Sequence, residues 1–255
     1  MPTELTLIPE VRGPLSVYPI ASARDHGIDA FVTDRFGGVS FGSYDSLNLG
    51  LHVGDRADHV MENRQRVGDA IGVSVDHLVI VRQVHGHDDV SADDARPDTC
   101  ADAMHTDRSD LALAILVADC LPVLLYDQAS PRLAVVHAGW RGLDARVLTH
   151  ALEGFPDPAR VHAFIGPSIS PEAYQVGSEV AERFETVAGA LRPDADSRWR
   201  LDLRRVAQDQ LLGLGVSGSH ITACTQTTDG GETFFSDRAK RPCGRFALVA
   251  RRVVA

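Results

Sequence analysis

Alternating hydrophobic and polar runs predict a β-hairpin in the middle of the chain. Residues 122–126 and 133–136 are rich in Val and Leu, and a polar segment that contains Pro lies between them. This pattern is typical of two antiparallel strands joined by a turn. Cys120 precedes the first strand and His137 follows the second, so the hairpin would bring a thiol and an imidazole to the same end of a sheet. There they could share a metal ion or a proton.

The remaining pattern predicts both helices and strands. Apolar residues at helical spacing predict helices over residues 56–71, from about 138 to 153, from 178 to about 187, and over 201–214. Short runs rich in β-formers predict strands over 15–20, 28–33, 78–84, 111–117, 160–165, 221–225, 233–235 and 245–254. No internal repeat or linker interrupts the chain, so we expect residues 1–255 to form one domain of mixed α+β class.

A long glycine-rich segment, residues 34–55, lies between the second strand and the first helix. Phe36, Phe41 and Tyr44 are interleaved with its glycines, and loops of this length in compact domains are usually functional or disordered. Disordered segments are poor in aromatic residues, so the composition argues against disorder. We expect a binding loop, with a plain surface connection as the alternative.

One charged residue interrupts the apolar face of the helix predicted over residues 56–71. Arg64 falls in line with Val60, Val67 and Ile71, and a guanidinium on a core-facing stripe needs an anion or a carboxylate as its partner. Two interpretations stay open. Arg64 binds phosphate or substrate, or it has a structural role in which it reaches solvent or pairs with an Asp.

His85 is a third candidate ligand, because it also follows a predicted strand and precedes a glycine. A lone His is more often a hydrogen-bonded structural residue, but Cys120 and His137 occupy the same kind of position. The spacings of 35 and 17 residues are too long for a zinc finger. Ligands that come from separate strands are instead typical of catalytic zinc sites.

The acidic segment 88–110 is short of apolar residues and predicts a solvated excursion from the sheet. Cys100 and His105 lie within it and His87 lies just before it, and we interpret all three as residues that are not ligands. Asp102 is a possible exception, since a carboxylate near the end of the excursion would re-enter the sheet just before the next strand.

Composition narrows the class of protein. The chain has 255 residues, of which 44% are hydrophobic, enough to bury a core. Its net charge of −10 disfavours nucleic acid and anionic membranes as partners. The longest apolar run, 111–118, is too short to span a bilayer, and the N-terminal residues lack the apolar core of a signal peptide. Four well-separated cysteines favour reduced thiols, so we expect a cytoplasmic protein.

The negative net charge does not exclude a small anion that a local arginine binds. The sequence predicts a helix that starts at residues 138–142, where small residues allow a close approach to the backbone. Free N–H groups at a helix start can hold an anion. Arg141 lies at this point, so we include it among the candidate contacts to substrate or phosphate.

Several motifs together resemble those of the bacterial laccase-domain family, the YfiH type. The motifs are SLNLGLHVGD at 46–55, NR at 63–64, QVHG at 83–86, ADCLPVLLYD at 118–127, HAGWRG at 137–142, GPSIS at 166–170 and FFS at 234–236. Members of this family have often been described as multicopper polyphenol oxidases. They are better understood as zinc-containing purine nucleoside phosphorylases that also deaminate adenosine and cleave methylthioadenosine.

The resemblance implies a ligand set and a fold. His85, Cys120 and His137 would be zinc ligands, and Arg64 would contact phosphate or substrate. The family fold is a layered α/β/β/α domain with mixed, largely antiparallel sheets, and it resembles the catalytic domain of the necrotising-factor toxin. The implied substrates are phosphate and the purine nucleosides adenosine, inosine, guanosine and methylthioadenosine. The oligomeric state, monomer or homodimer, stays open.

The resemblance also implies further residues of the pocket and shows where this chain departs from the family. Asn48 and His52 would line the same pocket as the zinc ligands. The family usually has Glu where this chain has Gln175, and Tyr-Arg-Arg where this chain has Asp237, Arg238 and Ala239. These departures affect contacts that the Glu and the Tyr would make, but they do not affect the metal ligands.

Three alternatives belong to other classes of protein. A Cys–His hydrolase would use Cys120 as nucleophile and His137 as base. A copper-dependent polyphenol oxidase needs many ligands in His-x-His pairs, and the 11 histidines here form only the pair His85 and His87. A metal-binding module without catalytic activity is the third alternative.

Overall fold

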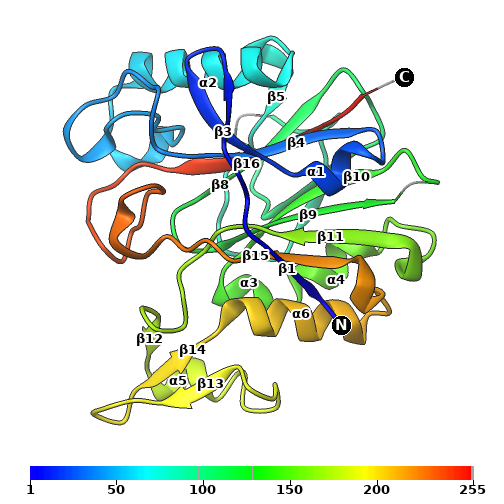
Figure 1. The fold of residues 1–255 in the computed structure, drawn as a ribbon, viewed down its shortest axis with the longest axis vertical. Helices are drawn as coiled ribbons and strands as arrows, with labels where there is room; N and C mark the ends of the chain where they lie inside the picture. The colour runs from blue at the N-terminus through cyan, green and yellow to red at the C-terminus, as the bar shows by residue number, and fades with distance from the viewer. Residues whose placement is uncertain (97, 128, 254–255) are drawn as a thin grey trace.

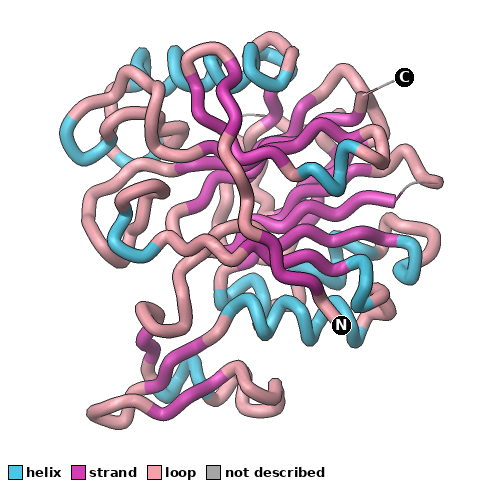
Figure 2. The backbone as a smooth tube through the Cα atoms, in the orientation of Figure 1, coloured by secondary structure: helices cyan, strands magenta, loops and turns pink. Residues whose placement is uncertain are grey.

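Two β-sheets packed face to face form the centre of the molecule (Figure 1). The structure, a computed structural model, describes residues 1–96, 98–127 and 129–253. Figure 2 shows helices on the outer side of each sheet, so the layers follow the order helix, sheet, sheet, helix. This order agrees with the layering expected from the family resemblance. The likeness to the toxin domain stays a prediction.

The predicted hairpin lies in the middle of the larger sheet, as strands β9 (Leu121–Asp127) and β10 (Leu133–Ala138). The seven strands follow the order β1 (Thr3–Leu5), β15 (Ile221–Cys224), β11 (Val161–Ile165), β9, β10, β7 (Ala103–Thr106) and β6 (Asp89–Ser91). Strands β1, β15 and β11 pair parallel at one side of the sheet, and β7 and β6 pair parallel at the other. Between them, β11, β9, β10 and β7 pair antiparallel.

The second sheet has six strands, and a small third sheet stands apart from both. The order in the second sheet is β2 (Glu10–Arg12), β3 (Leu15–Pro19), β4 (Ile28–Thr33), β16 (Phe246–Arg252), β8 (Ala112–Val117) and β5 (Leu78–Val79). The third sheet contains β12 (Gln175–Val176), β14 (Trp199–Leu201) and β13 (Leu191–Pro193), and it lies at the bottom of Figure 1.

Helices cover the outer faces of the two large sheets. The α-helices are α1 (Ala21–Arg24), α2 (Ala57–Ile71), α3 (Trp140–Asp144), α4 (Val147–Leu152), α5 (Ser178–Ala181) and α6 (Leu203–Gly213). Helix α2 packs on the six-stranded sheet, and α3, α4 and α6 lie below the seven-stranded sheet in Figure 1. None of the helices in the described part of the chain combines the length and the apolar composition that a bilayer crossing requires.

The central strands are hydrophobic without interruption because both of their faces are buried. In β8, Leu113, Ile115 and Val117 face the other sheet, whereas Ala114 and Leu116 face helix α2. Successive side chains of a strand point to opposite faces. A strand covered on both sides therefore has apolar residues at every position rather than at alternate ones.

The predicted strand 78–84 is too long and the predicted strand 233–235 is wrong, and side chains explain why. After β5, the predicted strand 78–84 leaves the sheet, and the amide of Gln83 takes the place of a strand by accepting from the Leu116 N–H (2.8 Å) and donating to the Leu116 carbonyl (2.7 Å). In the segment 233–235, Phe234 and Phe235 are buried in a loop, where Phe234 packs against Tyr18 and Phe246.

Two predicted helices are shorter than the pattern suggests. The helix expected over 138–153 divides into α3 and α4, because Arg146 between them has a left-handed backbone with φ of 62°. The helix expected from Ser178 to about Val187 is regular only as far as Ala181. Helix α2 agrees with the prediction and ends at Gly72, whose φ of 78° suits a residue without Cβ.

The contact between the two large sheets gives a test of stability. Leu124 is fully buried on the face of β9 that meets the other sheet, so we expect Leu124→Ala to lower the free energy of unfolding by about 2–5 kcal/mol. Leu212→Ala is the matched control, because Leu212 is 43% exposed on α6 and should change it by no more than about 0.5 kcal/mol. Urea unfolding followed by circular dichroism measures both. Equal small changes would contradict a tightly packed contact between the sheets.

Candidate metal centre

The structure brings His85, Cys120 and His137 together. Each offers one ligand atom, and these atoms all lie within 4.8 Å of one another. Cys120 directly precedes β9, and His137 pairs with Pro122 near the end of β10, so the hairpin places the two side by side. His85 reaches them from the loop that follows β5. The described residues hold no second group of three potential ligands of this kind.

The cluster is buried on one side and open on the other. His137 is 4% exposed, whereas His85 is exposed and Cys120 is half-buried. The rings of the two histidines meet edge to face, with centroids 4.8 Å apart. Three protein ligands with one open side suit a catalytic rather than a structural metal, since structural zinc sites are closed by four protein ligands.

The electrostatics favour the thiolate form of Cys120. Burial alone would raise the pKa of this thiol, but the charge and the hydrogen bond of His137, with those of His85, lower the pKa to about 6. Burial would lower the pKa of His137, and Cys120 and Asp102 instead raise it to about 9. The thiolate is the form of cysteine that binds metals and attacks electrophiles.

A buried carboxylate holds two of the three candidate ligands. Asp102 is fully buried, and its Oδ1 accepts hydrogen bonds from His137 Nδ1 (2.7 Å) and from the backbone N–H of His85 (2.9 Å). Its Oδ2 accepts from the backbone N–H groups of Gly86 (2.6 Å) and Val84 (3.1 Å). Sequence reasoning noted Asp102 only as an exception in an acidic segment. The flanking alanines at the start of β7 were the signal that this Asp lies inside the fold.

A glycine makes room for the cysteine sulfur. A Cβ on Gly139 would lie 2.8 Å from Cys120 Sγ and 3.4 Å from His85 Cδ2. Real Cβ atoms do not approach sulfur so closely, so any side chain here would displace the thiol. The HAGWRG motif therefore needs its first glycine for the shape of the cluster.

The cluster lies in a hollow of about 400 Å³ that contains several arginines. Arg141, Arg238, Arg241 and Arg245 line it, together with Trp140, Tyr174, Asp119 and Asp237. Arg141 was predicted as a contact, and its guanidinium lies over the Trp140 ring, 4.3 Å from the centroid. Sequence reasoning did not identify the arginines after residue 237, because they come from a loop that reaches the site only through tertiary structure.

Asp119 attaches that loop to the cysteine. Its Oδ1 accepts from Thr228 Oγ1 (2.6 Å) and its Oδ2 accepts from the backbone N–H of Arg238 (2.7 Å). Asp119 also has a left-handed backbone, with φ of 91°. The residue next to Cys120 in the ADC motif thus anchors the loop that carries Arg238 into the hollow.

His52 and Asn48 have different positions. His52 lines the metal hollow, as the resemblance implied, and burial, with the nearby charges of Arg245 and Arg64, lowers its pKa. Asn48 does not face the hollow. It is fully buried, and its side chain accepts from the N–H groups of Gly50 and Arg245, both at 2.9 Å, so it organises the loop instead of lining the pocket.

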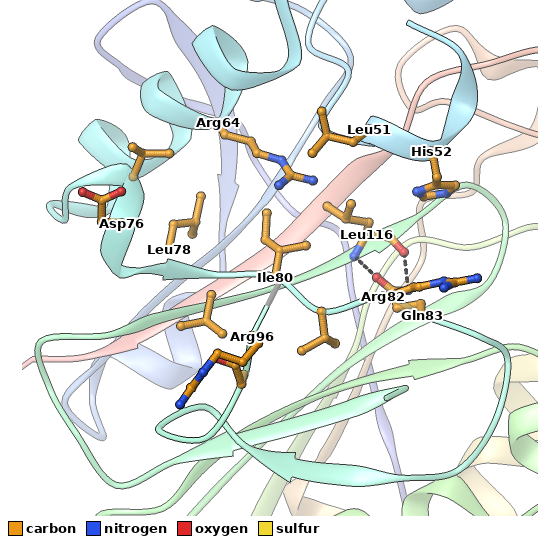
Figure 3. A pocket seen from close by; sticks show the side chains of 14 residues that line it. Leu51, His52, Arg64, Asp76, Leu78, Ile80, Arg82, Gln83, Arg96 and Leu116 are labelled. Atoms are coloured by element: carbon orange, nitrogen blue, oxygen red, sulfur yellow. Dashed lines mark hydrogen bonds between the residues drawn. The ribbon is translucent and has the colours of Figure 1, made fainter. Parts of the chain in front are cut away.

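Arg64 lies in a neighbouring hollow of about 530 Å³ (Figure 3). The two hollows share His52, Gln83 and Leu116. Arg64 Nε and Nη2 donate to the Leu49 carbonyl at 3.0 and 2.9 Å, and no carboxylate is among its bonded partners within the described residues. Burial lowers the pKa of this guanidinium to about 10. Arg64 thus does not form the structural Asp pair that the sequence left open.

The residues that we interpreted as non-ligands lie away from the cluster. Cys100 is exposed, and the His105 ring bonds Asp89 Oδ2 at 2.7 Å. His87 stacks near His150 instead, with ring centroids 4.7 Å apart.

The two departures from the family differ in position. The Gln175 amide donates to Asp194 Oδ2 (2.7 Å) at the small third sheet and is not part of the metal hollow. Asp237 lines the hollow and pairs with Arg245 (3.3 Å). The Asp237 side chain therefore lies in the hollow, whereas the Gln175 side chain lies outside it.

Comparison with known proteins identifies the family. A family model described as multi-copper polyphenol oxidoreductase laccase matches residues 29–252. The chain belongs to this family. It is 40% identical over 227 residues to a protein of Escherichia coli named purine nucleoside phosphorylase YfiH, a match that covers 87% of this chain and 92% of that one.

Solved structures of the family have the same fold. A Neisseria meningitidis protein is 35% identical and superimposes with a TM-score of 0.84, covering 89% of this chain and 95% of its own. YlmD from Geobacillus stearothermophilus is 28% identical, with a TM-score of 0.89 and coverage of 97% and 100%. The chain thus shares its overall fold with these two structures.

The close approach at Gly139 gives a prediction for this site. In Gly139→Ala, the new Cβ displaces Cys120 Sγ, so we expect the affinity for a metal ion, probed with zinc, to fall on the order of 10- to 100-fold while the fold survives. Competition with a chromophoric chelator measures the affinity, and circular dichroism checks the fold. Gly213→Ala is the control, because a Cβ there has no neighbour within 4 Å. Unchanged affinity in Gly139→Ala would mean that the sulfur is not a ligand.

Proposed function

We propose that this protein is a zinc-dependent purine nucleoside phosphorylase that also deaminates adenosine. The observation that carries the proposal is the open His–Cys–His cluster next to the hollow of Arg64, which has no carboxylate partner among the described residues. The similarity to the E. coli protein named purine nucleoside phosphorylase YfiH supports the same activity. Purine nucleosides and phosphate would be the substrates. Cytoplasmic location and the oligomeric state, monomer or homodimer, stay predictions.

The donor set fits zinc better than copper. A zinc ion held by His85, Cys120 and His137 supplies a Lewis acid and a bound water with a pKa of about 7. Two His and one Cys also occur in blue-copper sites, but these add a weak axial ligand, usually Met. Gln can replace that Met, but no methionine is among the described residues that line the hollow, and the Gln83 amide there is bonded at both ends to the backbone of Leu116. Copper therefore stays the less favoured cofactor.

Phosphorolysis requires an anchored phosphate next to the glycosidic bond. Phosphate oxygen attacks C1′, the bond from C1′ to the purine nitrogen breaks, and its electron pair leaves with the base, which takes up a proton. Arg64 can hold two phosphate oxygens with its planar fork. His52 lines both hollows, and its pKa is lowered by burial and then by the nearby charges of Arg245 and Arg64, so two arginines lie close to this junction.

Deamination would use water in place of phosphate. A water oxygen adds to C6 of adenosine, and the amino group leaves as ammonia after it takes up a proton. The arginines and Trp140 of the metal hollow can bind and orient the purine ring. The H-x-E and P-C-x-x-C signature of the usual nucleobase deaminases is absent from the sequence.

One observation favours a second candidate, a Cys–His hydrolase. The thiol of Cys120 has a lowered pKa beside His137, and His137 is in turn oriented by Asp102. This is the order of nucleophile, base and orienting carboxylate in hydrolytic triads. The position of His85 beside the same thiol supports the metal instead. Protection of Cys120 from iodoacetamide by one zinc per chain would argue against the hydrolase, because a coordinated thiolate is not free to attack.

The metal ligands give the main test of the function. We expect His85→Ala, Cys120→Ala and His137→Ala each to lose zinc and both activities, because the remaining two ligands bind the metal too weakly. The assay follows adenosine with and without phosphate. Adenine with ribose-1-phosphate reports phosphorolysis, and inosine reports deamination. A variant that loses zinc and keeps full phosphorolysis would contradict the proposal, and so would several copper atoms per chain with a blue absorption band.

A variant of Arg64 distinguishes phosphorolysis, which needs bound phosphate, from deamination, which does not. We expect Arg64→Ala to raise the phosphate KM and to lower phosphorolysis roughly ten- to a hundredfold, equivalent to about 1.5–3 kcal/mol for a charge-assisted pair. Deamination uses no phosphate and should fall much less.

Arg56→Ala is the matched control for this variant, since Arg56 lies exposed at the start of the same helix and pairs with Asp58. It should change neither reaction. Equal losses of both reactions in Arg64→Ala would mean that Arg64 acts by holding the loop through the Leu49 carbonyl. Unchanged rates would return Arg64 to a structural role.

A further inference from the structure

We propose that Asp102 is the positioning residue of the metal centre, and that this one carboxylate fixes two ligands in different ways. It selects the tautomer of the His137 ring, and it holds the backbone that presents His85. The inference rests on the metal site proposed above, but it does not depend on which reaction that site performs.

The first contact determines the protonation of His137. The Asp102 carboxylate only accepts hydrogen bonds, so the ring nitrogen that lies 2.7 Å from it, Nδ1, must carry the proton. Nε2 of a neutral ring then has a free lone pair. Nε2 is therefore the nitrogen that the ring offers to Cys120 and His85 in the cluster. A histidine ligand commonly donates its second ring N–H to a carboxylate in this way.

The second set of contacts determines the backbone at His85. His85 has a φ of 60°, a left-handed conformation that is uncommon for a residue with a side chain. Three successive N–H groups, those of Val84, His85 and Gly86, converge on the Asp102 carboxylate at 2.6–3.1 Å. A concave run of N–H groups around an anion stabilises such a turn. Without the carboxylate, the left-handed conformation of His85 would lose the three hydrogen bonds that stabilise it.

The main chain of Asp102 is itself held in place by hydrogen bonds. Its N–H donates to the Asp88 carbonyl (3.1 Å), and its carbonyl accepts from the N–H of His137 (2.7 Å). The residue is thus attached to β10 and to the chain that leads into β6 while its side chain holds the loop at His85. A ligand set supported in this way is preorganised, which is what accurate metal sites require.

An Asn cannot replace this Asp, although it has nearly the same shape. All four partners of the carboxylate donate hydrogen bonds, and Asn has one oxygen and one NH2 group. If the NH2 group faces His137, the ring must accept at Nδ1 and carry its proton on Nε2, so it cannot bind the metal. If the NH2 group faces Val84 and Gly86, the turn at His85 loses two hydrogen bonds. Each orientation therefore weakens one candidate ligand, His137 in the first and His85 in the second.

The experiment compares zinc affinity in Asp102→Asn and in a matched control. Asp89→Asn removes the same kind of pair, because Asp89 Oδ2 bonds His105 Nδ1 at 2.7 Å on strands β6 and β7, outside the cluster. We expect the zinc affinity of Asp102→Asn to fall roughly 10- to 100-fold and that of Asp89→Asn to change by less than about twofold. The cobalt-substituted proteins add a spectroscopic readout, since the visible bands of cobalt change when its ligands move.

A measurement on the wild-type protein does not depend on how the variant folds. In zinc-loaded protein with ¹⁵N-labelled histidine, the proposal requires His137 to carry its proton on Nδ1. A proton on Nε2 would overturn it, and so would a folded Asp102→Asn that keeps the wild-type affinity and cobalt spectrum. If Asp102→Asn does not fold, the tautomer in the wild type decides alone. A wild-type protein that binds no zinc would overturn the metal site and this inference together, whereas the other results concern Asp102 only.

Discussion

The register of the hairpin β9–β10 is the constraint on which the site depends. Every residue of β9 and β10 is buried, since one face packs against the helices and the other against the second sheet. A shift of one residue would exchange the two faces of a strand, and both faces are fitted to their neighbours. The register sets Leu121 opposite Ala138, so Cys120 and His137 come out at the same end. Packing energy thus fixes the positions of two ligands that themselves add little to the core.

Local features of this fold can be predicted from the sequence, whereas features that depend on distant residues cannot. The hairpin and helix α2 are local, and their apolar patterns and their ends at a turn or a glycine are visible in a short window. The end of β5 is not local, because it depends on the amide of Gln83 pairing with Leu116, 33 residues further along the chain. An apolar run alone cannot distinguish a strand from a buried loop, and so residues 233–235 were assigned wrongly.

In the candidate site, too, the residues next to local sequence patterns could be predicted, whereas their distant contacts could not. His85, Cys120 and His137 could be found because each follows or precedes an apolar run, although His85 is in fact held by a turn and not by a strand. The inward direction of Arg64 was visible from its stripe. The neighbours of Arg64 could not be predicted, because its contact with the Leu49 carbonyl and its place in the second hollow depend on how the loop 34–55 folds. Asn48 has the polarity of a binding residue, but its side chain bonds Gly50 within that loop and ties the loop to Arg245, in the chain before β16.

The distribution of charge explains how an acidic protein could attract a small anion such as the proposed phosphate. The chain carries a net charge of −10, yet the two joined hollows contain arginines from α2, from the loop before β16 and from α3. The surface charge repels large polyanions at a distance, and salt weakens that repulsion. Inside the hollows the arginines act on a bound anion at short range, where salt screens their charge less. A small anion therefore meets attraction only where its shape allows it to enter, beside the cluster that Asp102 supports.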